Sequence, residues 1–110
     1  MTSEQLVKLS RFFCSHCGAS DRLTQLCSDR LLGIGFEQYD HGDRQAFEDY
    51  TMEKMISMFD EEVADVVSYT LMLLLRPELG GELGPELVDF AQTWISAYSP
   101  LREHLEEVLP

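Results

Sequence analysis

Apolar residues recur at helical spacing along most of the chain, and the longest such stretch runs from Thr51 to Arg76. One face of this stretch carries side chains three and four positions apart: Met52, Ile56, Phe59, Val63, Val66, Val67, Thr70, Leu71 and Leu74. Pro77 ends it, because proline disfavours helical geometry in the residue before it. The pattern predicts one long central helix.

Two shorter helices are predicted before the central one. The first begins near Ser3 and ends near Gly18, since glycine adopts the left-handed conformation that closes a helix. The second begins at Ser20 and Asp21, whose side chains suit the N-cap, and runs toward Gly33. The polar segment 36–49 that follows is predicted to be a loop.

Two helices are predicted after the central one. Pro85 is placed as the first residue of one of them, because its missing N–H is not needed there. Ser99 and Pro100 are expected to break the chain, so that residues 101–109 form a last short helix. No segment reads as a strand. The sequence therefore predicts an all-α fold: a small bundle of four to five helices around the central helix, in a single domain over residues 1–110.

Charge narrows the choice of partners. The chain has 20 acidic and 8 basic residues, a formal charge of −12, which repels nucleic-acid phosphates and anionic membranes. We expect no direct nucleic-acid or membrane binding, and divalent cations or a basic protein as natural partners. The most apolar run, residues 63–75, is too short to span a bilayer and contains Asp65. Residues 1–10 lack the apolar core of a secretory signal, and three cysteines suit reduced thiols, so we expect a cytoplasmic protein.

Four carboxylates gather on the central helix: Asp60, Glu61, Glu62 and Asp65. At about 100° per residue, Glu62 and Asp65 face nearly the same way and could offer oxygens to one hard cation such as Mg²⁺. Asp60 points away from this pair, and Glu61 flanks it from the far side. The alternative is an ordinary solvated acidic face, because Glu-x-x-Asp is common on helices.

The residues around this cluster resemble a known motif. The run from Asp60 to Tyr69, DEEVADVVSY, is similar to the Glu-Glu-x-Ala-Asp-Val-x-x-Tyr helix of the MazG-like all-α nucleotide pyrophosphohydrolases. Upstream, Tyr39 precedes His41-Gly42, which resembles the Tyr-x-His-Gly turn of small phage-encoded members. The resemblance covers about residues 23–76.

The resemblance implies a Mg²⁺-dependent enzyme that hydrolyses nucleoside triphosphates to monophosphates and pyrophosphate. It implies that Glu62 and Asp65 bind the metal, that Glu61 is the catalytic acidic neighbour, and that the chain forms homo-oligomers. The family's other motif, Glu-Glu-x-x-Glu, has no counterpart on the preceding predicted helix, which offers Asp29 and Glu37. Glu48, Asp49 and Glu53 are the nearest substitutes. Nucleotide binding without hydrolysis therefore fits the sequence equally well.

Basic residues near the cluster are candidates for holding a substrate phosphate: His41, Arg44 and Lys54. They could equally neutralise neighbouring carboxylates on the surface, which is the commoner role of such residues.

Two further interpretations stay open. Cys14 and Cys17, with Cys27 and His41, could supply four zinc ligands, but a zinc site normally shows a second close pair of ligands, so we do not expect zinc. The acidic surplus also fits a non-enzymatic protein that binds a basic partner, for example as a DNA mimic that inhibits a nucleic-acid-binding enzyme.

Overall fold

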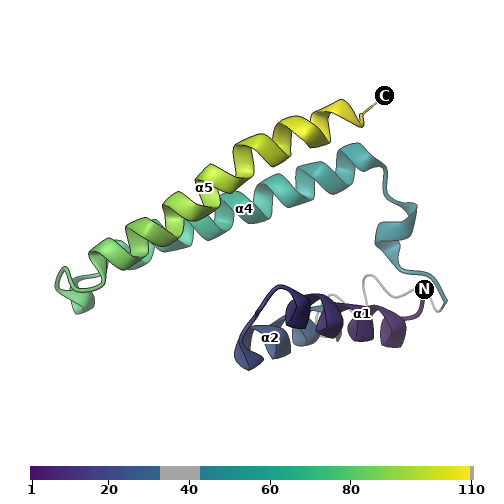
Figure 1. The fold of residues 1–110 in the computed structure, drawn as a ribbon, viewed down its shortest axis with the longest axis horizontal. Coiled ribbons are helices and arrows are strands. Elements are labelled where there is room, and N and C mark those ends of the chain that lie inside the picture. Colours follow the sequence, from purple (N-terminus) through teal and green to yellow (C-terminus); the bar gives the residue numbers. More distant parts are fainter. Residues whose placement is uncertain (33–42, 110) are drawn as a thin grey trace. The chain divides into compact units, whose positions relative to one another are not determined.

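The computed structural model describes residues 1–32 and 43–109, and within these residues it contains helices and no strand (Figure 1). The α-helices are α1 (Ser3–His16), α2 (Asp21–Leu32), α4 (Met52–Leu74) and α5 (Gly84–Glu107). Two short 3₁₀ helices, η1 (Ala46–Asp49) and η2 (Pro77–Leu79), lie between them. The predicted all-α class is confirmed. The chain divides into two compact units, Met1–Tyr50 and Thr51–Pro110, and the single domain stays a prediction.

The first unit is a pair of helices that begin at or next to the predicted residues, and the first of them stops at the predicted glycine. The Thr2 side chain accepts a hydrogen bond from the Gln5 backbone N–H at 3.1 Å, and the Gln5 side chain accepts one from the Thr2 N–H at 2.8 Å, which closes a capping box. Gly18 has a φ of 76°, as a left-handed stop requires. Ser20 accepts a hydrogen bond from the Leu23 N–H at 3.1 Å and so begins α2.

The described end of the predicted loop is more ordered than expected. Residues 46–49 form η1, and Gln45 just before it is almost fully buried at 3% exposure. The Gln45 side chain donates a hydrogen bond to the Ser3 hydroxyl at 3.1 Å, which ties this segment to the start of α1. A buried amide needs such partners, so the contact fixes the segment in place.

The second unit is a helical hairpin. Thr51 caps α4 by accepting a hydrogen bond from the Lys54 N–H at 3.1 Å, and the helix continues to Leu74, close to the predicted bounds. Gly80 (φ 56°) and Leu83 (φ 62°) then take left-handed conformations and reverse the chain. As a result α4 and α5 lie side by side, as Figure 1 shows, and they pack against each other along their length.

The side of α4 that faces α5, called the seam here, follows a coiled-coil pattern. Its buried and half-buried positions alternate steps of four and three residues: Ile56, Asp60, Val63, Val67, Thr70 and Leu74. This alternation is the spacing by which one helix packs its side chains between those of a second. The seam therefore follows directly from the periodicity of the sequence.

The predicted break at Pro100 is wrong, because α5 runs through it to Glu107 as one helix. Proline removes one backbone hydrogen bond, here the bond to the carbonyl of Ser96, and that residue is exposed, so water can solvate the carbonyl. Residues on both sides of the proline are also held by α4, since Tyr98 and Arg102 both bond to Asp60. Tertiary contacts here outweigh the local preference of proline.

Replacing Ile56 by alanine tests the seam. Ile56 is 4% exposed, so we expect the Ile56→Ala variant to lower the free energy of unfolding by about 2–3 kcal/mol. The measurement is urea unfolding followed by the fluorescence of Trp94, the single tryptophan, which lies in the same unit. Met72→Ala is the control, because Met72 is 56% exposed. The free energy of unfolding of this variant should fall by no more than about 0.5 kcal/mol. Equal losses in the two variants would contradict the described seam.

Candidate functional site: the carboxylates of α4

The structure divides the acidic cluster of α4 into two groups. Asp60 lies on the seam with its side chain 31% exposed, whereas Glu61, Glu62 and Asp65 are exposed. The division follows from helical geometry, because Asp60 occupies a position of the four-and-three repeat and the other three do not. Asp60 is therefore a packing residue of the hairpin, and the remaining carboxylates face outward.

Asp60 accepts hydrogen bonds from two residues of α5. The Tyr98 hydroxyl donates to Oδ1 at 2.5 Å, and Arg102 Nε lies 3.1 Å from both carboxylate oxygens. Arg102 also donates to Glu106 Oε2 at 2.7 Å, and the rings of Phe59 and Tyr98 stack with their centroids 6.2 Å apart. A charge-assisted set of bonds of this kind is stronger and more directional than bonds between neutral groups. It holds α4 and α5 at one relative alignment.

These contacts shift the ionisation of the residues that make them. The hydrogen bond from Tyr98 lowers the pKa of Asp60, and the guanidinium of Arg102 adds to this effect, because both stabilise the carboxylate. The same bond raises the pKa of Tyr98, since the hydroxyl must keep its proton to donate it. The pKa of Arg102 is raised mainly by Glu106 and further by Asp60. All three groups therefore favour the charge state that the network needs near neutral pH.

Glu62 and Asp65 keep the geometry that the sequence predicted for them. They lie one helical turn apart on α4, both are exposed, and no salt bridge or hydrogen bond of either side chain is found within the described residues. Among residues 1–32 and 43–109, however, no three His, Cys, Asp or Glu side chains are grouped as they would be around a metal ion. The described site thus offers two carboxylates and open solvent.

Two of the residues considered for a second acidic motif, Glu48 and Asp49, have other partners. Glu48 accepts hydrogen bonds from the Gln45 backbone N–H at 2.7 Å and from the Met1 ammonium at 3.1 Å, and these bonds lower its pKa, the first of them most. Asp49 pairs with Arg44 at 2.6 Å. These contacts are internal to the first unit, so Glu48 and Asp49 serve its local structure.

The basic candidates are spread over the chain. Arg44 is engaged by Asp49, which raises the pKa of the guanidinium, and Lys54 is exposed in the first turn of α4. His41 lies outside the described residues, so its role as a phosphate ligand stays a prediction.

Two of the three cysteines contact each other. Cys14 on α1 is buried and Cys27 on α2 is half-buried, and the two thiols are neighbours across the helix pair. Burial, with Cys14 as a neighbour, raises the pKa of the Cys27 thiol. Cys17 is exposed at the end of α1. Cys14 and Cys27 therefore act as packing residues between α1 and α2.

The sequence did not identify Tyr98 and Arg102 as partners of Asp60. Their spacing of four residues would have placed both on one face of a helix, but the predicted break at Pro100 assigned them to different helices. The error at the proline therefore concealed the central contact of the hairpin.

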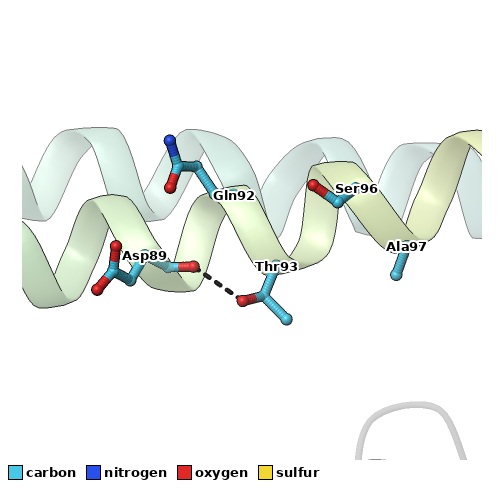
Figure 2. Close-up of a pocket in the computed structure, with 5 residues that line it drawn as sticks. All are labelled: Asp89, Gln92, Thr93, Ser96 and Ala97. Atoms are coloured by element: carbon cyan, nitrogen blue, oxygen red, sulfur yellow. Dashed lines mark hydrogen bonds between the residues drawn. The ribbon is translucent and has the colours of Figure 1, made fainter.

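The outer side of α5 carries a shallow hollow, shown in Figure 2, that is lined by Asp89, Gln92, Thr93, Ser96 and Ala97. All five side chains come from α5 alone, and the Thr93 hydroxyl donates to the Asp89 carbonyl of the same helix at 2.9 Å. Such bonds to the preceding turn are usual for threonine on a solvated helix surface. The hollow is a polar helix face without a second wall.

The chain was compared with protein-family models, curated proteins and solved structures, and none of them matches it. The resemblance to the MazG-like motif therefore stays a prediction. Within the described residues, no helix has both the length and the apolar character needed to cross a membrane.

The hydrogen bonds that Asp60 accepts from Tyr98 and Arg102 predict a gain in folding stability that depends on pH. Since the folded pKa of Asp60 is below its ordinary value of about 4, the gain is present above that value and disappears as the pH falls through the folded pKa. Asp60→Asn should therefore be less stable than the wild type at about pH 7, and the difference should shrink steadily below about pH 4. The measurement is urea unfolding followed by Trp94 fluorescence at several pH values.

The control for this experiment is Glu61→Gln, which removes a charge from the adjacent exposed position. The free energy of unfolding of this variant should stay close to that of the wild type at both acid and neutral pH. If the free energies of unfolding of the wild type and Asp60→Asn differ by the same amount at acid and neutral pH, the role given to the ionised carboxylate is contradicted.

Proposed function

We propose that this chain is a Mg²⁺-dependent protein of the nucleoside triphosphate pyrophosphohydrolase type, with Glu62 and Asp65 as its metal ligands. The observation that carries the proposal is that these two carboxylates are exposed one turn apart on the longest predicted helix, inside the run from Asp60 to Tyr69 that resembles the MazG-like motif. The rigid hairpin beneath them supports it, because ligands on a fixed helix keep their spacing.

The donor set fits Mg²⁺ in its chemistry. This ion is commonly bound in proteins through one or two carboxylates, with water and substrate phosphates completing its shell. When bound, it would supply positive charge to the phosphates and acidify a coordinated water. Glu61 is proposed to orient or deprotonate the attacking water, since it is an unpaired carboxylate beside the ligands among the described residues. Lys54, on the same helix as the two ligands, is proposed to contact the phosphates.

The proposal also covers the level of activity, the cellular location and the oligomeric state of the protein. A missing Glu-Glu-x-x-Glu motif leaves the described site with two ligands, which suits a protein that binds nucleotides and also one that hydrolyses them slowly. We place the protein in the cytoplasm, where nucleoside triphosphates occur, and we propose that it functions as a homo-oligomer.

Release of pyrophosphate tests the enzymatic form of the proposal. The wild type, incubated with each nucleoside triphosphate and Mg²⁺, should release pyrophosphate, and Glu62→Gln and Asp65→Asn should each reduce the rate at least about tenfold, as loss of a metal ligand or its support commonly does. Glu103→Gln is the matched control, because Glu103 is an exposed carboxylate on the other helix of the hairpin. Its rate should equal that of the wild type.

Calorimetry separates binding from catalysis. Heat of Mg²⁺ binding in the presence of a non-hydrolysable nucleotide, lost in Glu62→Gln, would support a binding protein even without turnover. If the wild type shows neither pyrophosphate release nor Mg²⁺ binding with nucleotide, the proposal fails.

A second candidate function is that of an acidic protein that binds a basic partner and blocks its nucleic-acid site. The observation that favours it is the charge of −12 together with outward carboxylates on both helices of the hairpin, including Glu61, Asp65, Asp89, Glu103 and Glu107. Rows of carboxylates on a rigid rod can replace phosphates in a positively charged groove. This function needs no metal and no turnover.

Salt dependence tests the second candidate. Immobilised protein should retain a basic partner from cell lysate at low salt, and retention should fall steeply as salt is raised, because the Debye length shrinks from about 30 Å at 0.01 M to about 8 Å at 0.15 M. Duplex DNA should compete for the same partner. A retained protein that is unaffected by both salt and DNA would contradict this function.

A further inference from the structure

Cys14 and Cys27 place two thiols next to each other in the interior of the α1–α2 pair. Cys14 lies on α1 and is 7% exposed, and Cys27 lies on α2 and is half-buried. Two observations locate Cys27 against the same turn of α1: the Cys14 thiol is its interacting neighbour, and it lines one hollow together with Ser10. Ser10 and Cys14 are four residues apart, so they are neighbours on one face of α1. The Cys27 side chain therefore lies against this turn, beside the Cys14 sulfur.

A surface hollow gives access to one of the two thiols. It is lined by Ser10 of α1 and, on α2, by Cys27, Arg30 and three leucines: Leu23, Leu26 and Leu31. The hollow opens to solvent, so a small molecule can enter it and reach the Cys27 sulfur. Cys14 is buried and is not part of its lining. A reagent therefore meets Cys27 first, and Cys14 can react only afterwards.

The third thiol is badly placed for a bond to Cys14. Cys17 follows Cys14 by three residues at the end of α1, and the Cβ atoms of such a pair are about 5–6 Å apart on a helix. A disulfide needs Cβ atoms about 3.5–4.5 Å apart. A Cys14–Cys17 bond would have to unwind the last turn of α1, which the Cys17 N–H closes by donating to the Phe13 carbonyl at 2.9 Å. A bond across the helix pair needs no unwinding, because side chains of two packed helices meet directly.

We propose that Cys14 and Cys27 are a redox modification site, at which a small disulfide such as oxidised glutathione converts the two thiols to one disulfide between α1 and α2. The Cys27 thiolate attacks one sulfur of the small disulfide, which forms a mixed disulfide and releases one small thiolate. The Cys14 thiolate then attacks the Cys27 sulfur and releases the second small thiolate. The protons of both cysteines end on the two released thiols, and two electrons pass from the protein to the small disulfide.

The new bond would cross-link the two helices of the first unit. It closes the chain between Cys14 and Cys27 into a loop, and a closed loop has fewer unfolded conformations, so the oxidised unit is harder to unfold. In a reducing compartment an excess of small thiols keeps the pair reduced, and a more oxidising balance of thiols and disulfides shifts it. The site belongs to the first unit and does not depend on whether Glu62 and Asp65 bind Mg²⁺.

Oxidised glutathione tests the proposal on the full chain. The reaction is run at about pH 8.5, because burial raises the pKa of the Cys27 thiol and the thiolate is the reactive form. The wild type should lose two hydrogen atoms by mass spectrometry. Trypsin cuts after arginine, so it releases residues 12–22, which hold Cys14 and Cys17, apart from residues 23–30, which hold Cys27. These two peptides should be joined until a reductant is added.

Serine variants assign the bond to its two sulfurs. Cys17→Ser is the matched control and should form the same link in the same yield, whereas Cys14→Ser and Cys27→Ser should form no internal disulfide. Should the buried Cys14→Ser variant fail to fold, Cys27→Ser decides, since it leaves Cys14 and Cys17 as the only possible pair. Oxidation of Cys17→Ser should also raise the thermal midpoint of helix loss, followed by circular dichroism, by at least about 5 °C.

Three results would overturn the proposal. The first is an internal disulfide in Cys27→Ser, which would show that Cys14 pairs with Cys17. The second is a Cys17→Ser chain that keeps both thiols, or carries only bound glutathione, under conditions that oxidise a small dithiol completely. The third is an equal thermal midpoint for the oxidised and reduced forms of Cys17→Ser, because a bond between the packed helices must restrict the unfolded chain.

Discussion

The alignment of α4 and α5 depends on a single charged residue in their seam. Every other seam position of α4 is apolar or a threonine, and such side chains pack almost equally well when two helices slide by one turn. Asp60 does not allow this, because a shifted α5 would move Tyr98 and Arg102 away and leave a half-buried carboxylate without partners. One polar residue in an apolar seam is a known means of fixing helix register. The position of α5 relative to the outward residues of α4 follows from it.

Pro100 shows where reasoning from local sequence fails. The helix periodicity of α4, the cap at Ser20 and the stop at Gly18 are local properties, so they could be predicted. Continuation through Pro100 could not, because it depends on contacts with a helix about forty residues earlier in the chain. Along α5 the half-buried position that follows Tyr98 is Arg102, four residues on, whereas a regular seven-residue repeat counted from half-buried Leu87 would place it at Leu101. This extra residue in the repeat directs Arg102 toward Asp60 and leaves Leu101 outside.

The acidic cluster was predicted in part. Rotation around the helix correctly separated Asp60 from Glu62 and Asp65, because that separation depends only on residue number. The role of Asp60 was missed, since the residues that bind it belong to another helix. Of the predicted phosphate contacts, Arg44 has a carboxylate partner that sequence alone could not assign. What remains at the candidate site is Glu61, Glu62 and Asp65, and their spacing is a local property of α4.

The acidity of the chain acts on association through charge. Two copies of charge −12 repel each other, and salt screens this repulsion. Attraction to a basic partner would be weakened by the same screening. Salt therefore acts with opposite sign on the approach of a second copy and on the approach of a basic partner. Glu62 and Asp65 lie one turn apart on the exposed side of α4, so they contribute to both of these electrostatic effects.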